Sequence, residues 1–127
     1  MWENQKPLQR VLLVEDAPFL RYAFGRLLRL NGYEVMEAND GHEALDRINE
    51  FNPHVIVTDL MMPGMDGVEL IQRLHDNPCT AGLPVVAITA DPTYEVEQRA
   101  RDAGAVDFIA KPIDMPSLLL RLRAIQN

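Results

Sequence analysis

Chemically capable side chains follow short apolar runs at four separate places in the chain. These positions are Glu15-Asp16, Asp59, Thr89 and Lys111. Carboxylate oxygens suit a hard divalent cation such as Mg²⁺ better than they suit softer metals. A carboxylate held beside such a cation, a lysine and a hydroxyl is placed to attack a phosphoryl group and form an aspartyl phosphate. That chemistry requires the four segments to meet, which depends on the elements that carry them.

The chain alternates short apolar runs with amphipathic stretches, which predicts a strand followed by a helix, repeated five times. The runs 11–14, 55–57 and 85–88 are nearly continuous and rich in β-branched residues, as is typical of strands covered on both faces. The more polar run 33–38 and the last run, 106–110, are expected at the sheet edges. Short connections predict a parallel sheet with right-handed crossovers. The fold class is therefore α/β, a three-layer sandwich of five strands and five helices in the flavodoxin-like order 2-1-3-4-5.

Local signals mark the five helices. Pro18 and Asn31-Gly32 bracket the first, and Asp91-Pro92 and Gly104 bracket the fourth. An aspartate with a glutamate three residues later, a capping box, opens the second and third helices: Asp40 with Glu43, and Asp66 with Glu69. An apolar stripe indicates the fifth: Leu118, Leu122 and Ile125.

Ligands of such sheets bind beyond the carboxyl ends of the strands, beside the switch point between strands one and three. Glu15, Asp16 and Asp59 should therefore converge in a partly buried cleft. Carboxylates so close together stay ionised only when a cation lies among them, which favours Mg²⁺. Lys111 adds a second positive charge and Thr89 a hydroxyl donor. The neighbours Glu15 and Asp16 are best placed as metal ligands, which leaves Asp59, expected to face outward, as the nucleophile.

Four segments resemble the receiver domain of two-component response regulators, in order and at the family's spacing: VLLVEDAP, VIVTDLMMPGMDG, VVAITA and AGAVDFIAKPID. The resemblance covers nearly the whole chain. It implies that Asp59 accepts a phosphoryl group from a phosphohistidine of a sensor histidine kinase or a histidine phosphotransfer protein. It also implies that Mg²⁺, or Mn²⁺ in its place, is bound by Glu15, Asp16, Asp59 and the backbone carbonyl of Met61.

The same resemblance assigns further roles. Thr89 and Phe108 match the family's switch positions, Lys111 matches the lysine that contacts the phosphoryl oxygens, and Pro112 is a candidate for a cis peptide bond. Phosphorylation is then expected to change the face built from the fourth helix, fifth strand and fifth helix. That face would control an unidentified partner or output domain. A second copy of the chain would be one such partner, in a phosphorylation-dependent homodimer. Met61 has no polar side chain to orient a hydrolytic water, so we expect its contribution to be steric.

Composition limits the classes of protein to which the chain can belong. Its 127 residues, 47% hydrophobic and 24% charged, fit one domain spanning residues 1–127, with 1–8 as a flexible N-terminal extension. Nineteen acidic against twelve basic residues give a net charge of −7, which disfavours direct contact with nucleic acid. The single cysteine, Cys79, and the lack of any apolar run near roughly eighteen residues favour a cytoplasmic protein with no membrane segment.

Three other functions are compatible with parts of the sequence. A Mg²⁺-dependent aspartyl-phosphate phosphatase of the haloacid-dehalogenase type needs an aspartate two residues after the nucleophile, where this chain has Met61. A flavin or nucleotide carrier is disfavoured because neither GxGxxG nor GxxxxGK[ST] follows any predicted strand. A receiver that binds partners without phosphorylation ranks low because nothing essential is missing. We therefore expect a signalling domain that assists only its own phosphorylation and dephosphorylation, not an enzyme.

Overall fold

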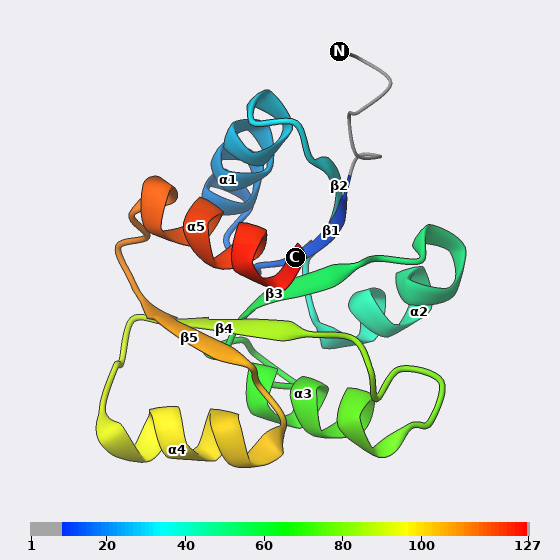
Figure 1. The fold of residues 1–127 in the computed structure, drawn as a ribbon. Coiled ribbons are helices and arrows are strands. Elements are labelled where there is room, and N and C mark those ends of the chain that lie inside the picture. Colours follow the sequence, from blue (N-terminus) through cyan, green and yellow to red (C-terminus); the bar gives the residue numbers. More distant parts are fainter. Residues whose placement is uncertain (1–8, 127) are drawn as a thin grey trace.

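A computed structural model describes residues 9–126, in which strands and helices alternate as expected (Figure 1). The expected flexible extension, residues 1–8, lies outside the described residues. The elements are β1 (Arg10–Val14), α1 (Pro18–Leu30), β2 (Glu34–Ala38), α2 (Gly41–Phe51), β3 (Val55–Asp59), α3 (Gly67–Asp76), β4 (Val85–Thr89), α4 (Tyr94–Ala103), β5 (Asp107–Ala110) and α5 (Met115–Gln126).

The strands form one parallel sheet in the order β2-β1-β3-β4-β5, which confirms the predicted topology. Val11 of β1 lies opposite Val35 of β2 on one side and Val55 of β3 on the other. Helices α1 and α5 cover one face of the sheet, and α2, α3 and α4 cover the other (Figure 1). The result is the expected three-layer, flavodoxin-like sandwich.

Successive residues of each central strand enter different cores. Val11 and Leu13 pack with α1 and α5, whereas Leu12 and Val14 pack with the helices of the opposite face. All four side chains are at most 1% exposed. Each buried aliphatic side chain contributes roughly 1.5–3 kcal/mol to folding. Burial on both faces explains why these strands are apolar without alternation.

The helix ends agree with the sequence signals at all but one place. The aspartate half of both predicted capping boxes is present, with the aspartate oxygen 2.8 Å from the amide nitrogen three residues on: Asp40 with Glu43, and Asp66 with Glu69. The returning half differs, because the Glu43 carboxylate accepts from Asn39 N and the Glu69 carboxylate contacts Arg73. The predicted start of the fourth helix at Asp91-Pro92 was wrong, because α4 begins at Tyr94. Thr93 is the N-cap, and its Oγ1 accepts a hydrogen bond from Val96 N at 3.3 Å. Asp91 N donates instead to Thr89 Oγ1 at 3.0 Å, which keeps Asp91 in the loop after β4.

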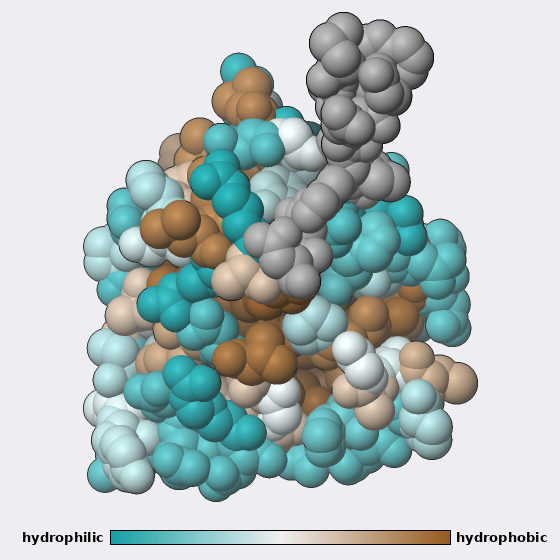
Figure 2. Space-filling view, in the orientation of Figure 1, coloured by the Kyte–Doolittle hydropathy of each residue, from teal (hydrophilic) through white to brown (hydrophobic). Residues whose placement is uncertain are grey.

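The helix surfaces differ in character. Figure 2 shows apolar side chains at the surface around α1, where Phe19 and Leu30 are exposed, and a mainly hydrophilic surface over α4. None of the described helices combines the length and the apolar character that crossing a bilayer requires.

Candidate functional site

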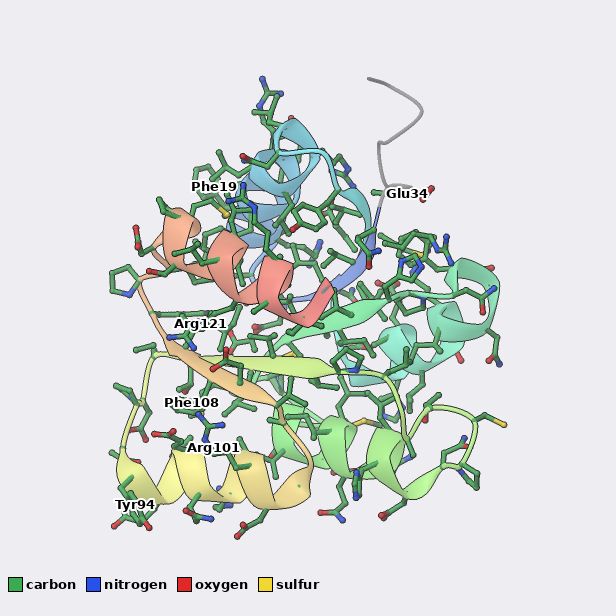
Figure 3. The ribbon with its side chains drawn as sticks, viewed as in Figure 1. Phe19, Glu34, Tyr94, Arg101, Phe108 and Arg121 are labelled. Carbon is green, nitrogen blue, oxygen red and sulfur yellow. The ribbon has the colours of Figure 1, made fainter. Side chains whose placement is uncertain are left out.

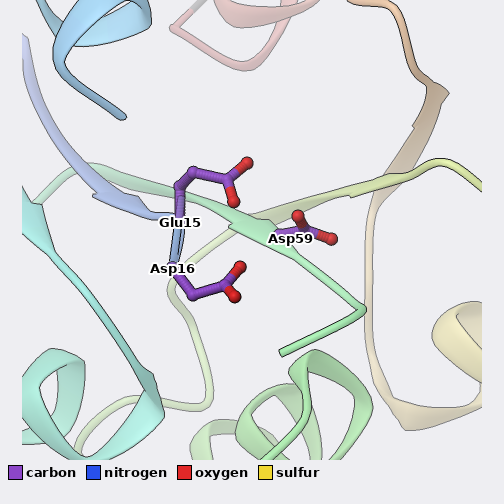
Figure 4. A group of neighbouring side chains, drawn as sticks. All are labelled: Glu15, Asp16 and Asp59. Carbon is purple, nitrogen blue, oxygen red and sulfur yellow. The ribbon is translucent and has the colours of Figure 1, made fainter. Parts of the chain in front are cut away.

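Three carboxylates meet at the carboxyl edge of the sheet. Glu15 and Asp16 follow β1, and Asp59 is the last residue of β3, the strand paired with β1. One oxygen of each carboxylate lies within 4.8 Å of the others. Figure 4 shows the three side chains extending to the same side, beyond the ends of the strands. The structure thus brings together the three acidic residues that the sequence singled out.

Lys111, which follows β5, reaches the same group of carboxylates. Its Nζ donates hydrogen bonds to Asp59 Oδ2 at 2.5 Å and to Glu15 Oε1 at 2.9 Å. The peptide bond from Lys111 to Pro112 is cis. Three carboxylates against one ammonium leave the site net negative, so it retains an attraction for a further cation.

Burial and hydrogen bonding shift the pKa values of two of these groups. Burial raises the pKa of the Glu15 carboxyl above its ordinary 4.5, although hydrogen bonds from Lys111 and from Ala17 N oppose the rise. Burial lowers the pKa of the Lys111 ammonium, but its hydrogen bonds to Asp59 and Glu15 outweigh that effect. The pKa of Lys111 therefore lies above 10.5, and the ammonium is charged at neutral pH.

Asp59 does not face outward as expected, since the residue is only 4% exposed. Lys111 and Met61 hold its two carboxylate oxygens from different sides: Oδ2 accepts from the ammonium and Oδ1 accepts from Met61 N at 2.9 Å. The chain turns back closely after this point, with Gly67 N donating to Leu60 O at 3.0 Å. A Cβ at Gly67 would meet the backbone of Asp59 and lie 2.6 Å from Leu60 Cα. Asp59 is thus held through its side chain, and the segment that follows it is held by the close approach of Gly67.

Thr89 and Phe108 lie on one side of the sheet. Thr89 ends β4 and is fully buried. Phe108 of β5 pairs with Ala87, two residues before Thr89, so the three side chains point to the same face. Phe108 is half-buried and packs against the core beneath α4. It lies on a surface shared with Arg101 of α4 and Arg121 of α5 (Figure 3).

A groove of about 550 Å³ opens beside Lys111, between α1 and the segment after β5. Its lining is mainly apolar: Leu20, Phe24, Ala90, Lys111, Pro112 and Ile113. A molecule that reaches Lys111 through this groove therefore contacts apolar side chains as well as charged ones.

The donor set suits Mg²⁺. Glu15, Asp16 and Asp59 offer only oxygen ligands, as this ion prefers. Two oxygens on one Mg²⁺ are at most about 4.2 Å apart, because each Mg–O distance is 2.0–2.1 Å. The oxygens of the three carboxylates lie within 4.8 Å of one another, close to that separation. These residues therefore fit the ion that the sequence implied.

Sequence reasoning missed Arg21 of α1, whose Nη1 donates to the backbone oxygen of Glu15 at 2.8 Å. Its position five residues after Asp16 carries no motif, and its charge on an otherwise apolar stretch was the only signal.

The family model of the response regulator receiver domain matches residues 11–123. The chain belongs to this family. Receiver domains bind Mg²⁺ at an acidic pocket, and Glu15, Asp16 and Asp59 form such a pocket here. The expected family membership is confirmed, and with it a place in two-component signalling.

Relatives and solved structures agree with this membership. The chain is 39% identical, over 91% of its length, to the response regulator MprA of Mycolicibacterium vanbaalenii and to that of Mycobacterium avium. It spans 49% and 50% of those proteins, about half their length. The fold matches CheY4 of Vibrio cholerae with a TM-score of 0.88 and 29% identity, covering 94% of this receiver domain and 99% of CheY4. A putative response regulator from Chloroflexus aurantiacus gives 0.88 and 33%, covering 94% and 98%.

Proposed function

We propose that Asp59 accepts a phosphoryl group from a phosphohistidine of a sensor histidine kinase or a histidine phosphotransfer protein, in a reaction that requires Mg²⁺. The observation that carries the proposal is the contact of the buried Asp59 carboxylate with Lys111, beside two further carboxylates. A buried acid in that setting has a nucleophilic oxygen, a neighbouring positive charge and a set of metal ligands within one pocket.

The two oxygens of Asp59 differ in their partners. Oδ1 is fixed by the backbone N–H of Met61, whereas Oδ2 contacts the ammonium of Lys111, which is carried on a long side chain. Oδ2 is therefore the attacking oxygen in our proposal. A lone pair of Oδ2 forms the bond to phosphorus, the N–P bond of the donor breaks, and its electron pair stays on the imidazole nitrogen. The Lys111 ammonium then moves with the oxygens of the transferred phosphoryl group and offsets their negative charge.

Glu15, Asp16, Asp59 and the backbone carbonyl of Met61 are the proposed ligands of Mg²⁺, and Mn²⁺ is a substitute of similar oxygen preference. When bound, the ion supplies positive charge that stabilises the phosphoryl oxygens in the transition state. The residues of this chain fix the ligand oxygens, hold Asp59 in place and exclude bulk water from its carboxylate.

In this proposal, phosphorylation of Asp59 changes the outer surface of the domain through Thr89 and Phe108. The Thr89 hydroxyl, which now accepts from Asp91 N, turns toward a phosphoryl oxygen as a donor. Phe108, on the same side of the sheet, then moves into the space vacated near Thr89. The surface of α4, β5 and α5 changes its affinity for an output domain, a partner protein or a second copy. Identical spectra of residues 89–110 before and after phosphorylation would contradict this switch.

The apolar groove beside Lys111 supports the choice of a protein as phosphodonor. A donor histidine has to reach a buried carboxylate, and the walls formed by Leu20, Phe24 and Ile113 offer apolar surface for its carrier next to that carboxylate.

Incubation with Mg²⁺ and acetyl phosphate, followed by intact-mass measurement, tests the proposal. The unmodified chain should gain the mass of one phosphoryl group, and Asp59→Asn should gain none. Asp46→Asn, a charge-matched change on the exposed side of α2, should behave like the unmodified chain. Continued labelling of Asp59→Asn would assign the acceptor to another residue.

A further inference from the structure

One guanidinium links three elements behind the acidic pocket. Arg21 Nη1 donates to the backbone oxygen of Glu15 at 2.8 Å, and Arg21 Nε lies 3.5 Å from Glu37 Oε1 on β2. The side chains of Arg21 and Glu37 are 20% and 24% exposed, so both are mostly covered by protein. Arg21 therefore connects α1, the turn after β1 and strand β2.

Glu37 is held by a second arginine on the same helix. Arg29 Nη2 donates to Glu37 Oε2 at 3.1 Å and to the backbone oxygen of Val35 at 3.0 Å. The carboxylate of Glu37 is thus contacted by one arginine on each side. Contact with Arg29 restricts the movement of the Glu37 carboxylate. Glu37 can therefore hold the Arg21 guanidinium in one position.

Gly25 lies midway between the two arginines on α1, against the Glu37 carboxylate. A glycine inside a helix costs about 1 kcal/mol relative to alanine, so its presence there calls for a packing reason. A Cβ at this position would lie 3.0 Å from Glu37 Oε2 and 3.3 Å from Arg29 Nη1. The absence of a side chain thus leaves room for the Glu37 carboxylate in its present position, which a Cβ would displace slightly.

The backbone of Glu15 is consequently fixed at both of its polar atoms. Its N–H donates to Ala38 O at 3.1 Å, and its carbonyl accepts from Arg21. That carbonyl belongs to the peptide joining Glu15 to Asp16, so its orientation sets the directions in which the two acidic side chains leave the backbone.

We propose that Arg21, anchored by Glu37, is a positioning residue for Mg²⁺ binding. The inference rests on the proposed function of Glu15 and Asp16 as ligands. Arg21 touches neither the ligand oxygens nor the acceptor. It acts by restricting the Glu15–Asp16 peptide to one orientation, so that the ligand oxygens are arranged before the ion arrives. Without it, the ion has to restrain that peptide itself, which weakens binding.

Three substitutions separate the contacts. Arg21→Met removes both the hydrogen bond to Glu15 and the ion pair with Glu37. Arg21→Lys keeps a positive charge but reaches only one of the two partners, because an ammonium lacks the guanidinium fork. Glu37→Gln removes the charge of the anchor. Arg26→Met is the matched control, since Arg26 is exposed on the same helix and forms no ion pair among residues 9–126.

The primary measurement is the rise in melting temperature with Mg²⁺ concentration, with no phosphodonor present. Loss of a group that orients a metal ligand lowers affinity about tenfold or more, so Arg21→Met should raise the half-saturating Mg²⁺ concentration by about tenfold. Arg21→Lys and Glu37→Gln should give smaller increases, and Arg26→Met none. The rate of Asp59 phosphorylation by acetyl phosphate should fall at low Mg²⁺ and recover at saturating Mg²⁺.

Several results would overturn the inference. One is the same half-saturating Mg²⁺ concentration for Arg21→Met and Arg26→Met. Another is a lower melting temperature of Arg21→Met without any change in that concentration, which would show a purely structural role. If Arg21→Met does not fold, unchanged Mg²⁺ affinity in Arg21→Lys and Glu37→Gln overturns it. Absence of both Mg²⁺ stabilisation and phosphorylation in the unmodified chain would overturn the proposed function and this inference together.

Discussion

The ammonium nitrogen of Lys111 lies 2.5 Å from Oδ2 of Asp59, although 52 positions separate the two residues in the chain. The same ammonium contacts Glu15 Oε1 at 2.9 Å. Lys111 therefore neutralises two of the three carboxylates that a divalent cation would bind. The lysine and a cation therefore compete for the negative charge of the same carboxylates, and this competition has measurable consequences.

Lys111→Met should destabilise the fold and strengthen its response to Mg²⁺. Removing the cation of a buried pair leaves uncompensated carboxylates and costs about 3 kcal/mol. The stability cost comes from the loss of its two partly buried hydrogen bonds to Asp59 and Glu15. Urea unfolding with and without Mg²⁺ measures both effects. A smaller Mg²⁺ stabilisation of the variant than of the unmodified chain would contradict the competition.

Glu15→Gln should stabilise the metal-free protein progressively as pH rises above 4.5. Burial raises the pKa of Glu15, so the folded state binds this proton more tightly than the unfolded state does. Its favourable contribution is complete below 4.5 and is lost as pH rises through the folded-state pKa. Melting temperatures of both proteins between pH 4 and pH 8 test this sign. A difference that shrinks or reverses with rising pH is the opposite result.

Gly67→Ala should be destabilising even though alanine favours helices. Its Cβ would lie 2.6 Å from Leu60 Cα, and the atoms in the way are backbone, which cannot move aside cheaply. We expect a loss of about 2–3 kcal/mol, together with slower phosphorylation, because the displaced segment carries Asp59. Gly82→Ala is the matched control, since a Cβ there meets nothing within 4 Å. Equal unfolding free energies for the two variants would disprove the close approach.

Thr89→Val should prevent phosphorylation of Asp59 from changing the surface of α4, β5 and α5. Valine has nearly the same shape but leaves Asp91 N without its acceptor, at a cost of about 1 kcal/mol. Asp59 should still be phosphorylated, whereas the NMR signals of Phe108 should no longer shift on phosphorylation. Thr89→Ser keeps the hydroxyl and should retain the shift. A normal Phe108 response in Thr89→Val would remove Thr89 from the switch.

The fold was predictable because burial shapes the sequence of its strands. Central strands are covered on both faces and read as continuous apolar runs, while the edge strand β2 retains Glu34 and Glu37. The acidic group was predictable for a related reason, since the strand order alone places Glu15 and Asp59 at neighbouring strand ends.

Other features required coordinates. The burial of Asp59 follows from where Lys111 and Glu15 lie around it, and no local pattern encodes that. The role of Arg21 depends on how α1 packs across β2. The start of α4 was missed because two neighbouring segments, Asp91-Pro92 and Thr93, each carry a capping signal, and a hydrogen bond to Thr89 decides between them.

Chemical trapping of the acceptor gives the most direct test of the central claim. After reaction with acetyl phosphate and Mg²⁺, borohydride reduces an acyl phosphate to an alcohol and so marks the residue that carried it. Peptide mass spectrometry should then find the modification at position 59 alone, and only when Mg²⁺ was present. Modification of Glu15, Asp16 or Asp91 instead, or of Asp59 equally well after Mg²⁺ is removed by a chelator, would contradict the account.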